Sequence, residues 1–491
     1  MALRSGKCTN FGLCAKADTR EAQSVPDRAD FVCQECKRPL TPIGGKAPAG
    51  ERSAAPMVTL AVVFLLIGGL TYFYFSQRHG QDGGGAPLLR LSGSNTIGAE
   101  LAPALAQAWI ETRGASNPER QPGAPDEVRI AGVANGKRVA VEIKAHGSKT
   151  AFSDLAAGAC DIGMASRKIT ADEAAILQAK GLGDLTSNVN EKVLGLDGVS
   201  VIVNDTNTVD SMSKDEVAAI FAGEAAGRQW HIYARDDKSG TYDTFKDRVL
   251  GTRSLVASAK RLEDSRALVR EVSQDRDGIG FVGLPYAVGV KVVAIAEKHA
   301  APRVPNTMTV RTEEYPLSRR LFLYVPENAS PAARDFVRFA LSPAGQEIVE
   351  KIGFVGQKIE VMTEKPPAAG PKAYVGLLPS SDRLSVDFRF RTGSSELDTK
   401  AMDDISRVSS AMSGQFAGRG VMLVGFADNT GQAGANLALS KRRAEAVAEQ
   451  MQRRGIQPIL VTGFGAELPV ADNTTPEGRE KNRRVEVWIR K

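Results

Sequence analysis

The sequence predicts a multidomain α/β protein with a small cysteine-bearing head, a single transmembrane helix and two folded α/β parts. Three observations lead to this fold class. Four of the five cysteines lie near the start, an apolar run without charge follows at Ala54–Phe75, and β-like and helix-like segments alternate over the rest of the 491 residues. A chain of this length is expected to form several hydrophobic cores instead of one.

The composition says little about partners. The formal net charge is only +6, and no long basic run points to nucleic acid, so we expect no nucleic-acid partner. Cys160 is the only cysteine after the apolar run. That part of the chain therefore has no internal disulfide, and its stability must come from hydrophobic cores.

The head, residues 1–45, contains four cysteines in two short knuckles, C-x5-C and C-x2-C. Paired thiolates of this kind suit a tetrahedral zinc ion, although two disulfides or four free thiols remain alternatives. The second knuckle, FVCQECKRPLTP, resembles that of zinc ribbons. The resemblance implies one structural zinc ion in a closed site that folds the head, which would bind a cytoplasmic protein partner or stabilise the amino terminus. The expected ligands are Cys8, Cys14, Cys33 and Cys36.

The apolar run Ala54–Phe75 is long enough to cross a bilayer as one helix. It begins too far along the chain for a cleaved signal peptide, so we expect an uncleaved anchor. Basic residues near the run favour a cytoplasmic head. They are Lys37, Arg38, Lys46 and Arg52 on the head side, against fewer beyond the run. A flexible linker, residues 76–87, should follow.

Residues 88–362 alternate short apolar runs such as VSVIVN, GIGFVGL and RLFLYV with helical stretches such as KDEVAAIFAGE. This alternation predicts an α/β part with mostly parallel sheets. Its length suits two lobes with a cleft between them. We expect one lobe to comprise about 88–200 and 308–360 and the other about 205–300, with hinge closure around a ligand.

Three short segments of this part have the composition of an anion site. Ser92–Thr96 and Arg235–Thr241 each lie between a predicted strand and a predicted helix, and Gly147–Thr150 precedes another helical stretch. Exposed amides at a helix start, with hydroxyls and an arginine beside them, suit the oxygens of a tetrahedral anion. Any one segment alone would indicate ordinary helix capping. Three in this order indicate an oxyanion site.

The segments SGSNTIG, DIGMASRKIT, RDDKSGTYDTF and GIGFVGLPYA resemble, in order, the phosphate-binding proteins of bacterial ABC transporters. The resemblance implies a two-lobed periplasmic-binding-protein fold that closes around phosphate or a similar oxyanion. An acidic residue that follows the Ala-Ser pair in well-known members is Arg167 here, so anion selectivity stays open; Asp237 could pair with Arg235 or accept the proton itself. The implied binding residues are Asn95, Thr96, Ser148, Ser166, Arg167, Arg235, Asp237, Ser239, Gly240 and Thr241.

After a second linker, residues 363–381, residues 382–491 resemble the OmpA-like peptidoglycan-binding domain, an α/β sandwich. The resemblance rests on GFAD, LSKRRA and the terminal NRRVE. It implies that Arg443 binds the carboxylate of diaminopimelate in the peptide stem and Asp428 its ammonium group. The implied peptidoglycan-binding residues are Asp428, Asn436, Arg443, Asn482 and Arg483.

These parts together predict a non-enzymatic envelope protein, anchored in the bacterial inner membrane with its bulk in the periplasm. It would bind phosphate or a related oxyanion and attach to peptidoglycan. The alternative is a structural tether between membrane and wall whose middle domain has lost its ligand. Catalysis is not expected, because the four histidines are scattered without metal-ligand spacing and no activated nucleophile is apparent.

Overall fold

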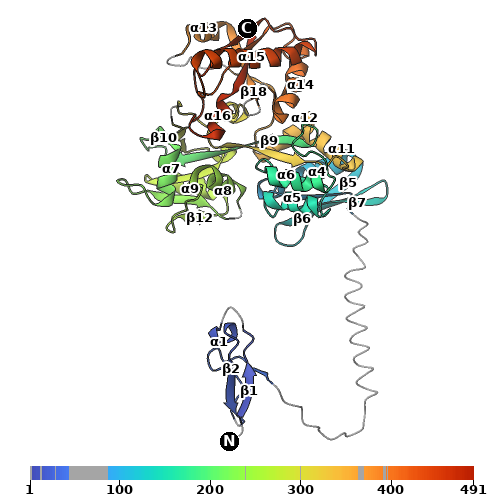
Figure 1. Ribbon diagram of the computed structural model, residues 1–491, viewed down its shortest axis with the longest axis vertical. Coiled ribbons are helices and arrows are strands. Elements are labelled where there is room, and N and C mark those ends of the chain that lie inside the picture. The colour runs from blue at the N-terminus through green and yellow to red at the C-terminus, as the bar shows by residue number, and fades with distance from the viewer. Residues whose placement is uncertain are drawn as a thin grey trace. The chain divides into compact units, whose positions relative to one another are not determined.

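The computed structural model divides the chain into two compact parts, Met1–Gly83 and Gly84–Lys491 (Figure 1). The residues that it describes are 3–10, 14–27, 29–43, 87–237, 239–298, 300–362, 370–390, 394 and 396–491.

The first part is a small antiparallel sheet built around the cysteines. Its strands are β1 (Leu3–Lys7), β2 (Ala22–Pro26) and β3 (Thr41–Pro42), in the order β2-β1-β3, and the short helix α1 (Ala15–Asp18) follows Cys14. Among the described residues of this part, the buried hydrophobic side chains besides the cysteines are Ala17, Val25 and Leu40. So small a core is expected to need a cross-link or a metal ion for stability.

The prediction of a single-pass inner-membrane protein is corrected. Within the described ranges, no helix combines the length and the apolar character that a bilayer crossing needs. The predicted span, Ala54–Phe75, and the predicted linker 76–87 fall almost wholly outside those ranges.

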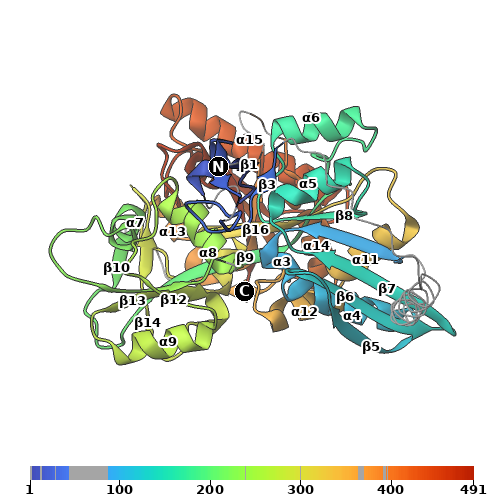
Figure 2. The ribbon, with the colours of Figure 1, turned by 90° about the horizontal axis from the view of Figure 1, so that it is seen from below.

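The second part contains two lobes that share one long sheet, with strand order β12-β11-β13-β9-β16-β8-β4-β7-β6-β5 (Figure 2). The first lobe has its own core around Trp109 and Phe336. Its elements are β4 (Leu89–Gly93), α3 (Asn95–Gly98), α4 (Leu101–Thr112), β5 (Ala115–Pro122), β6 (Glu127–Ala134), β7 (Lys137–Lys144), α5 (Ser148–Ala156), β8 (Ile162–Ala165), α6 (Ala171–Ala179), α11 (Pro331–Leu341) and α12 (Pro343–Ile352).

The second lobe is built around a separate core that contains Phe221, Phe245 and Phe281. Its elements are β10 (Ser211–Ser213), α7 (Lys214–Ala222), β11 (His231–Arg235), α8 (Gly240–Phe245) with a π-helical turn at Lys246–Leu250, β12 (Lys260–Leu262), α9 (Ser265–Gln274), β13 (Gly278–Gly283), β14 (Lys291–Val292), β15 (Ala294–Ala296) and α10 (Thr307–Arg311).

Two antiparallel strands, β9 (Glu191–Val203) and β16 (Ser318–Tyr324), connect the lobes. β9 pairs with β13 of the second lobe, and β16 pairs with β8 of the first. The sheet is therefore mixed, whereas the sequence predicted mostly parallel strands. The two-lobed fold itself is as predicted.

One lobe boundary differs from the prediction. Residues 308–317 were expected in the first lobe, but Val310, Tyr315 and Leu317 are buried in the core of the second. The Tyr315 hydroxyl donates a hydrogen bond of 2.7 Å to the carbonyl of Val199 on β9. This segment packs against the apolar side chains of β9 and therefore belongs to the second lobe. Sequence order does not reveal this tertiary contact.

The C-terminal domain is a five-stranded sheet of order β17-β18-β21-β19-β20 covered by helices. Ile405, Val447 and Val487 lie in its main core. Its elements are β17 (Val361–Met362), α13 (Lys372–Val375), β18 (Ser381–Arg389), α14 (Thr399–Ser413), β19 (Val421–Gly425), α15 (Ala433–Gln452), β20 (Leu460–Gly463), α16 (Pro476–Asn482) and β21 (Arg484–Arg490).

This domain begins earlier than predicted. β17, placed by the sequence in the middle domain, pairs with β18, and α13 lies inside the predicted linker 363–381. The ring of Tyr374 on α13 packs edge-on against Trp488, and its hydroxyl donates to the Glu486 carboxylate at 2.9 Å. Burial of this aromatic ring explains why the segment is ordered although its composition is that of a linker.

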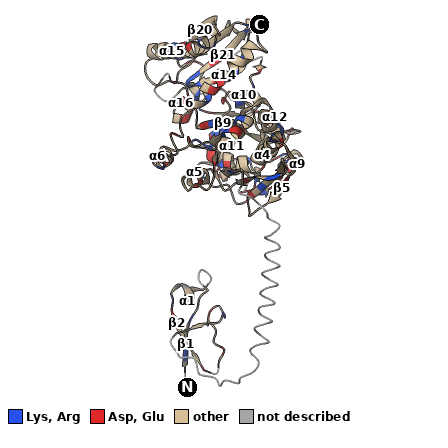
Figure 3. Ribbon diagram, turned by 90° about the vertical axis from the view of Figure 1, so that its right-hand side faces the viewer, with Lys and Arg blue, Asp and Glu red and all other residues tan. Residues whose placement is uncertain are grey.

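Buried ion pairs join the C-terminal domain to the two-lobed domain, and charged residues gather around β9 (Figure 3). Arg383 on β18 contacts Glu314 at 2.5 Å and Asp387 at 2.8 Å. Arg320 on β16 contacts Asp398 at 2.8 Å. Although burial opposes ionisation, the charge of Arg383 and its arginine neighbours lowers the pKa of Glu314 far below its usual value. The interface therefore consists of buried, oppositely charged side chains, and the burial of each depends on the charge of its partner.

Replacing Arg383 with Met should strongly destabilise this interface. The variant leaves Glu314 and Asp387 buried without their shared cation, which typically costs about 3–5 kcal/mol. The matched control is Arg453→Met, because Arg453 pairs with Glu449 at 2.6 Å but both side chains are exposed. There the loss should stay below about 1 kcal/mol. Urea unfolding of both variants measures the difference, and equal losses would contradict the described role of Arg383.

Candidate functional site

The four cysteines of the first part converge on one point. Their sulfur atoms all lie within 4.8 Å of one another, with Cys8 Sγ 3.5 Å from Cys36 Sγ and Cys14 Sγ 3.7 Å from Cys33 Sγ. All four thiols are free of disulfides. A regular tetrahedron with Zn–S bonds of about 2.3 Å has sulfur atoms about 3.8 Å apart, so the spacing suits a bound zinc ion.

Polar groups around the cysteines favour a thiolate at Cys33. The side chain of Gln23 donates to Cys33 Sγ at 3.3 Å. The backbone amide of Cys36 is the main cause, and with the Gln23 side chain and the Glu35 amide it lowers the pKa of Cys33 to about 6. The turn of the second knuckle therefore directs backbone amides toward the Cys33 sulfur.

In the two-lobed domain, two of the three predicted anion segments meet Ser166 where β4 and β8 end. Asn95 and Thr96 open α3, Ser148 opens α5, and Ser166 directly follows β8. The Ser148 hydroxyl accepts a hydrogen bond of 3.0 Å from the Ser166 amide and lies 3.1 Å from the Ser166 hydroxyl. Parallel strands bring their carboxyl ends to one edge, which explains the convergence. The result is a cluster of hydroxyls beside two helix starts.

Arg319 lies in the middle of this cluster, and the sequence reasoning missed it. Its guanidinium donates to Ser166 Oγ at 3.1 Å, to Thr96 Oγ1 at 2.6 Å and to the Gly240 carbonyl at 2.7 Å. The residue is only 4% exposed and its Nε lies 3.4 Å from Asp197. Two adjacent arginines at the start of the apolar run RLFLYV were the available signal, since a buried strand rarely carries arginine without a specific partner.

The second lobe contributes the start of α8. Ser239 caps this helix by accepting from the Tyr242 amide, and Thr241 lies in its first turn. A Cβ atom on Gly240 would lie 2.3 Å from Thr96 Oγ1, so only glycine permits this approach of the two lobes. The predicted residues Thr96 and Gly240, from opposite lobes, are thus in direct contact.

Three other predicted residues have partners outside this cluster. Arg235 donates to the carbonyls of Leu262 and Glu263 and to the Ser265 hydroxyl in its own lobe. Asp237 pairs with Arg261 at 2.6 Å, so the expected pairing of Asp237 with Arg235 is not formed.

The charge of Arg167 is likewise neutralised by a residue of its own lobe. It contacts Glu173 at 2.7 Å, and its guanidinium lies 5.1 Å from the ring centre of Phe152.

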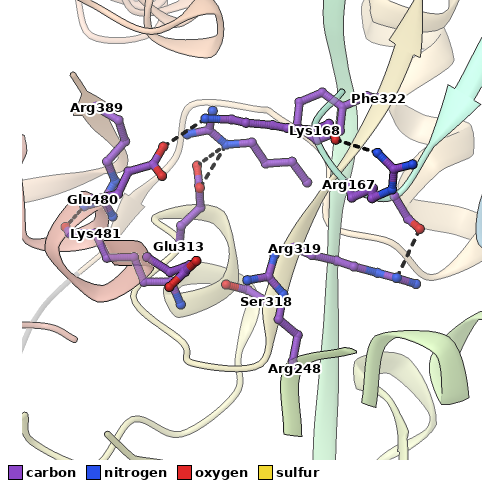
Figure 4. A pocket seen from close by; sticks show the side chains of 13 residues that line it. Arg167, Lys168, Arg248, Glu313, Ser318, Arg319, Phe322, Arg389, Glu480 and Lys481 are labelled. Carbon is purple, nitrogen blue, oxygen red and sulfur yellow. Dashed lines mark hydrogen bonds and ion pairs between the residues drawn. The ribbon is translucent and has the colours of Figure 1, made fainter. Parts of the chain in front are cut away.

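A cavity of about 300 Å³ borders the cluster on the side of the C-terminal domain (Figure 4). Ser166, Arg167 and Arg319 belong to its wall, and so do Arg389 of β18 and Lys481 of α16. The C-terminal domain therefore contributes side chains directly beside the predicted anion-binding residues.

The predicted peptidoglycan-binding residues lie together in the C-terminal domain. Arg483 Nη1 lies 3.2 Å from Asp428 Oδ2, and Arg443 is completely buried. Arg443 donates to the carbonyl of Ser394, while its Nη1 has no hydrogen-bond partner among the described residues. Burial and the charge of Arg483 lower the pKa of Arg443 to about 10, so it stays a cation at neutral pH.

The two predicted asparagines have supporting positions. The Asn482 side chain accepts from the amides of Val470 and Ala471 and donates to the Ala471 carbonyl, so it shapes the preceding loop. Asn436 is buried on α15, with its Oδ1 near Gly431.

Comparison with known proteins agrees with this geometry. A family model described as a PBP superfamily domain matches residues 113–344, and one described as the OmpA family matches residues 389–483. Protein SphX of Synechococcus elongatus is 31% identical over 240 residues, which cover 45% of this chain and 69% of that protein. Phosphate-binding protein PstS of Staphylococcus aureus is 30% identical over 227 residues, which cover 43% of this chain and 67% of that protein.

Among solved structures, a possible phosphate binding protein from Planctomyces limnophilus is 24% identical and has a TM-score of 0.45, with 59% of this chain and 95% of that chain covered. The two resemblances predicted from sequence motifs are confirmed by the matching family models and by the curated relatives. This chain belongs to the family of phosphate-binding proteins within the PBP superfamily, and it carries an OmpA family domain at its C-terminal end.

Proposed function

We propose that this chain is a binding protein of the bacterial envelope that captures phosphate or a similar oxyanion and attaches to peptidoglycan. The observation that carries the first half is the cluster of Thr96, Ser148 and Ser166 around the Arg319 guanidinium. Hydroxyls, helix starts and an arginine suit a tetrahedral anion. The relative PstS of Staphylococcus aureus is a phosphate-binding protein, which supports the same ligand.

The partners of the charged residues suggest weak discrimination among oxyanions. Proton-accepting carboxylates favour hydrogen phosphate over fully ionised sulfate, because only the former has a proton to donate. Here Arg167 occupies the position of the expected acid, and Asp237 is held by Arg261. We therefore expect phosphate and sulfate to compete for the same cluster.

Calorimetric titration of the full chain with phosphate and then sulfate tests the anion site. Ser239→Ala should weaken binding about tenfold, since a hydrogen bond to a charged group contributes about 1.5–3 kcal/mol. Ser330→Ala is the matched control, because Ser330 also caps a helix but lies on α11, outside the cluster. Both variants lose a cap of similar strength, about 1 kcal/mol. Absence of binding to the wild type, or equal affinities in both variants, would reject the site.

The unpartnered Nη1 of buried Arg443 supports the second half of the proposal. A buried donor without an acceptor is costly, and a ligand carboxylate would satisfy it. Asp428 lies near this arginine and offers a carboxylate to an ammonium group. The two ends of diaminopimelate in peptidoglycan carry this pair of charges.

Sedimentation with purified sacculi tests wall attachment. We expect Arg443→Met and the isosteric Asp428→Asn to abolish pelleting, because each removes one of the two charges. Arg442→Met is the control, since Arg442 is the exposed neighbour on the same helix. Circular dichroism should show that all three variants are folded. Pelleting that persists in both site variants would disprove these contacts.

For the first part of the chain we propose a structural zinc ion held by the four cysteines. The sulfur spacing and the small core support this, because a core of a few residues gains its stability from the metal. The full chain should then contain about one zinc ion, as measured by inductively coupled plasma mass spectrometry. Cys33→Ser should lose it, whereas Cys160→Ser, which changes the remaining buried cysteine, should retain it. Metal-free wild-type protein with an intact head would contradict the proposal.

A second candidate is a wall-bound scaffold whose two-lobed domain no longer binds an anion. The observation that favours it is Arg235, whose guanidinium is held by three groups of its own lobe. The same calorimetric titration separates the two candidates. In either case we propose binding and not catalysis. His231 is paired with Asp275 at 2.7 Å and lies outside the hydroxyl cluster.

A further inference from the structure

We propose that the cavity between the two-lobed domain and the C-terminal domain is a second anion site, suited to a compact oligophosphate. Its distinctive residues are Arg248 of the second lobe, Arg389 of β18 and Lys481 of α16 (Figure 4). None of the three belongs to the anion set predicted from the sequence. The cavity shares Ser166 and Arg319 with the Arg319 cluster, but the inference rests on the three cations that the two do not share.

The wall of the cavity carries an excess of positive charge. Seven cationic side chains line it, against the three carboxylates Glu313, Glu477 and Glu480. Two of these carboxylates are already occupied, since Arg320 contacts Glu313 at 2.9 Å and Lys168 contacts Glu480 at 2.9 Å. The excess therefore resides on side chains that these acids do not neutralise.

Among the described residues, Lys481 forms no ion pair, and Arg389 and Arg248 form one each. Lys481 donates to the carbonyls of Tyr315 at 3.2 Å and Pro316 at 3.4 Å. Both terminal nitrogens of Arg389 donate to backbone carbonyls, and its nearest recorded carboxylate contact is 3.4 Å. The ion pair of Arg248, with Asp247, is long at 3.8 Å. Such contacts fix the positions of these three side chains without neutralising their positive charge.

Two of these arginines also have an unsatisfied donor. The Nε atoms of Arg389 and Arg248 are buried and have no hydrogen-bond partner among the described residues. Arg389 is only 2% exposed. Leaving a charged donor unpaired in the interior is unfavourable, and a ligand oxygen in the cavity would relieve it.

The environment of Lys481 agrees with this assignment. Burial is the main cause that lowers its pKa to about 8, and the charges of Arg248 and Arg389 act in the same direction. Glu297 and Glu313 act oppositely. An anion among these cations would remove their mutual repulsion.

The size and lining of the cavity indicate the ligand class. About 300 Å³ is the lower end of small-molecule sites and exceeds what one phosphate ion needs. Guanidinium groups bind phosphate oxygens in pairs, and the hydroxyl of Ser166 also lines the cavity. An anion with three or four negative charges would match the excess on the wall, and inorganic pyrophosphate is the simplest probe of this class.

The test is calorimetric titration of the full chain with inorganic pyrophosphate at constant ionic strength. We expect one equivalent to bind, and Arg248→Gln and Lys481→Met each to weaken it at least about tenfold. Arg248→Gln is the safer variant for folding, because its side chain has no close partner to lose. Arg253→Gln is the matched control, since Arg253 lies in the same lobe, pairs with Glu224 and is absent from the cavity wall.

Ser239→Ala separates this cavity from the proposed phosphate site. Its pyrophosphate affinity should equal that of the wild type, because Ser239 is not part of the cavity wall. The inference is overturned if wild type does not bind pyrophosphate, if Arg248→Gln and Lys481→Met bind it normally, or if Ser239→Ala loses it to the same degree as they do. The last result would reduce the two sites to one.

Discussion

Two neighbouring arginines on one buried strand hold the 84–491 part together. Successive side chains of a strand point to opposite faces, so Arg319 and Arg320 of β16 reach different parts of the protein. Arg319 bonds Thr96 and Ser166 of the first lobe and the Gly240 carbonyl of the second. Arg320 bonds Glu313 and reaches Asp398 of the C-terminal domain. Because a buried charge without its partner is strongly destabilising, these two guanidinium groups require both lobes and the C-terminal domain to be in place.

The same strand places the proposed oxyanion cluster next to the domain that we propose binds the wall. α16 contributes Lys481 to the cavity and ends at Asn482, immediately before Arg483 and its Asp428 partner. On the other side, Lys168 and Arg167 directly follow Ser166. In each domain, the residues of the proposed site are thus close in sequence to residues that line the shared interface. An anion in the cavity would contact both domains and stabilise their contact by its preference for the joined state.

The sequence predicted the order of the parts, the two-lobed fold and the OmpA-like fold, because each rests on periodic apolar segments and local motifs. It also named Thr96, Ser148, Ser166 and Gly240 for one site, and in the structure Arg319 contacts Thr96, Ser166 and Gly240 while Ser148 contacts Ser166. It did not predict that Arg235 and Asp237 would find partners elsewhere. Arg235 is held by carbonyls at the end of a neighbouring strand, and Asp237 by Arg261 from that strand. These partners are more than twenty positions away, and no local pattern identifies them.

By itself, the sequence determined most of the alternation of strands and helices in the two α/β parts, which segments lie at helix starts, and that four cysteines form two knuckles. These properties follow from local spacing and residue chemistry. Only the tertiary structure decided that Arg319 lies at the centre of the hydroxyl cluster, that β17 and α13 join the C-terminal domain, and that Arg389 and Lys481 face a cavity beside the lobes. The physical reason is that a charge or an aromatic ring becomes buried only against partners brought in from distant segments. The energy of such a buried group, and hence its position, depends on contacts that exist only in the folded protein.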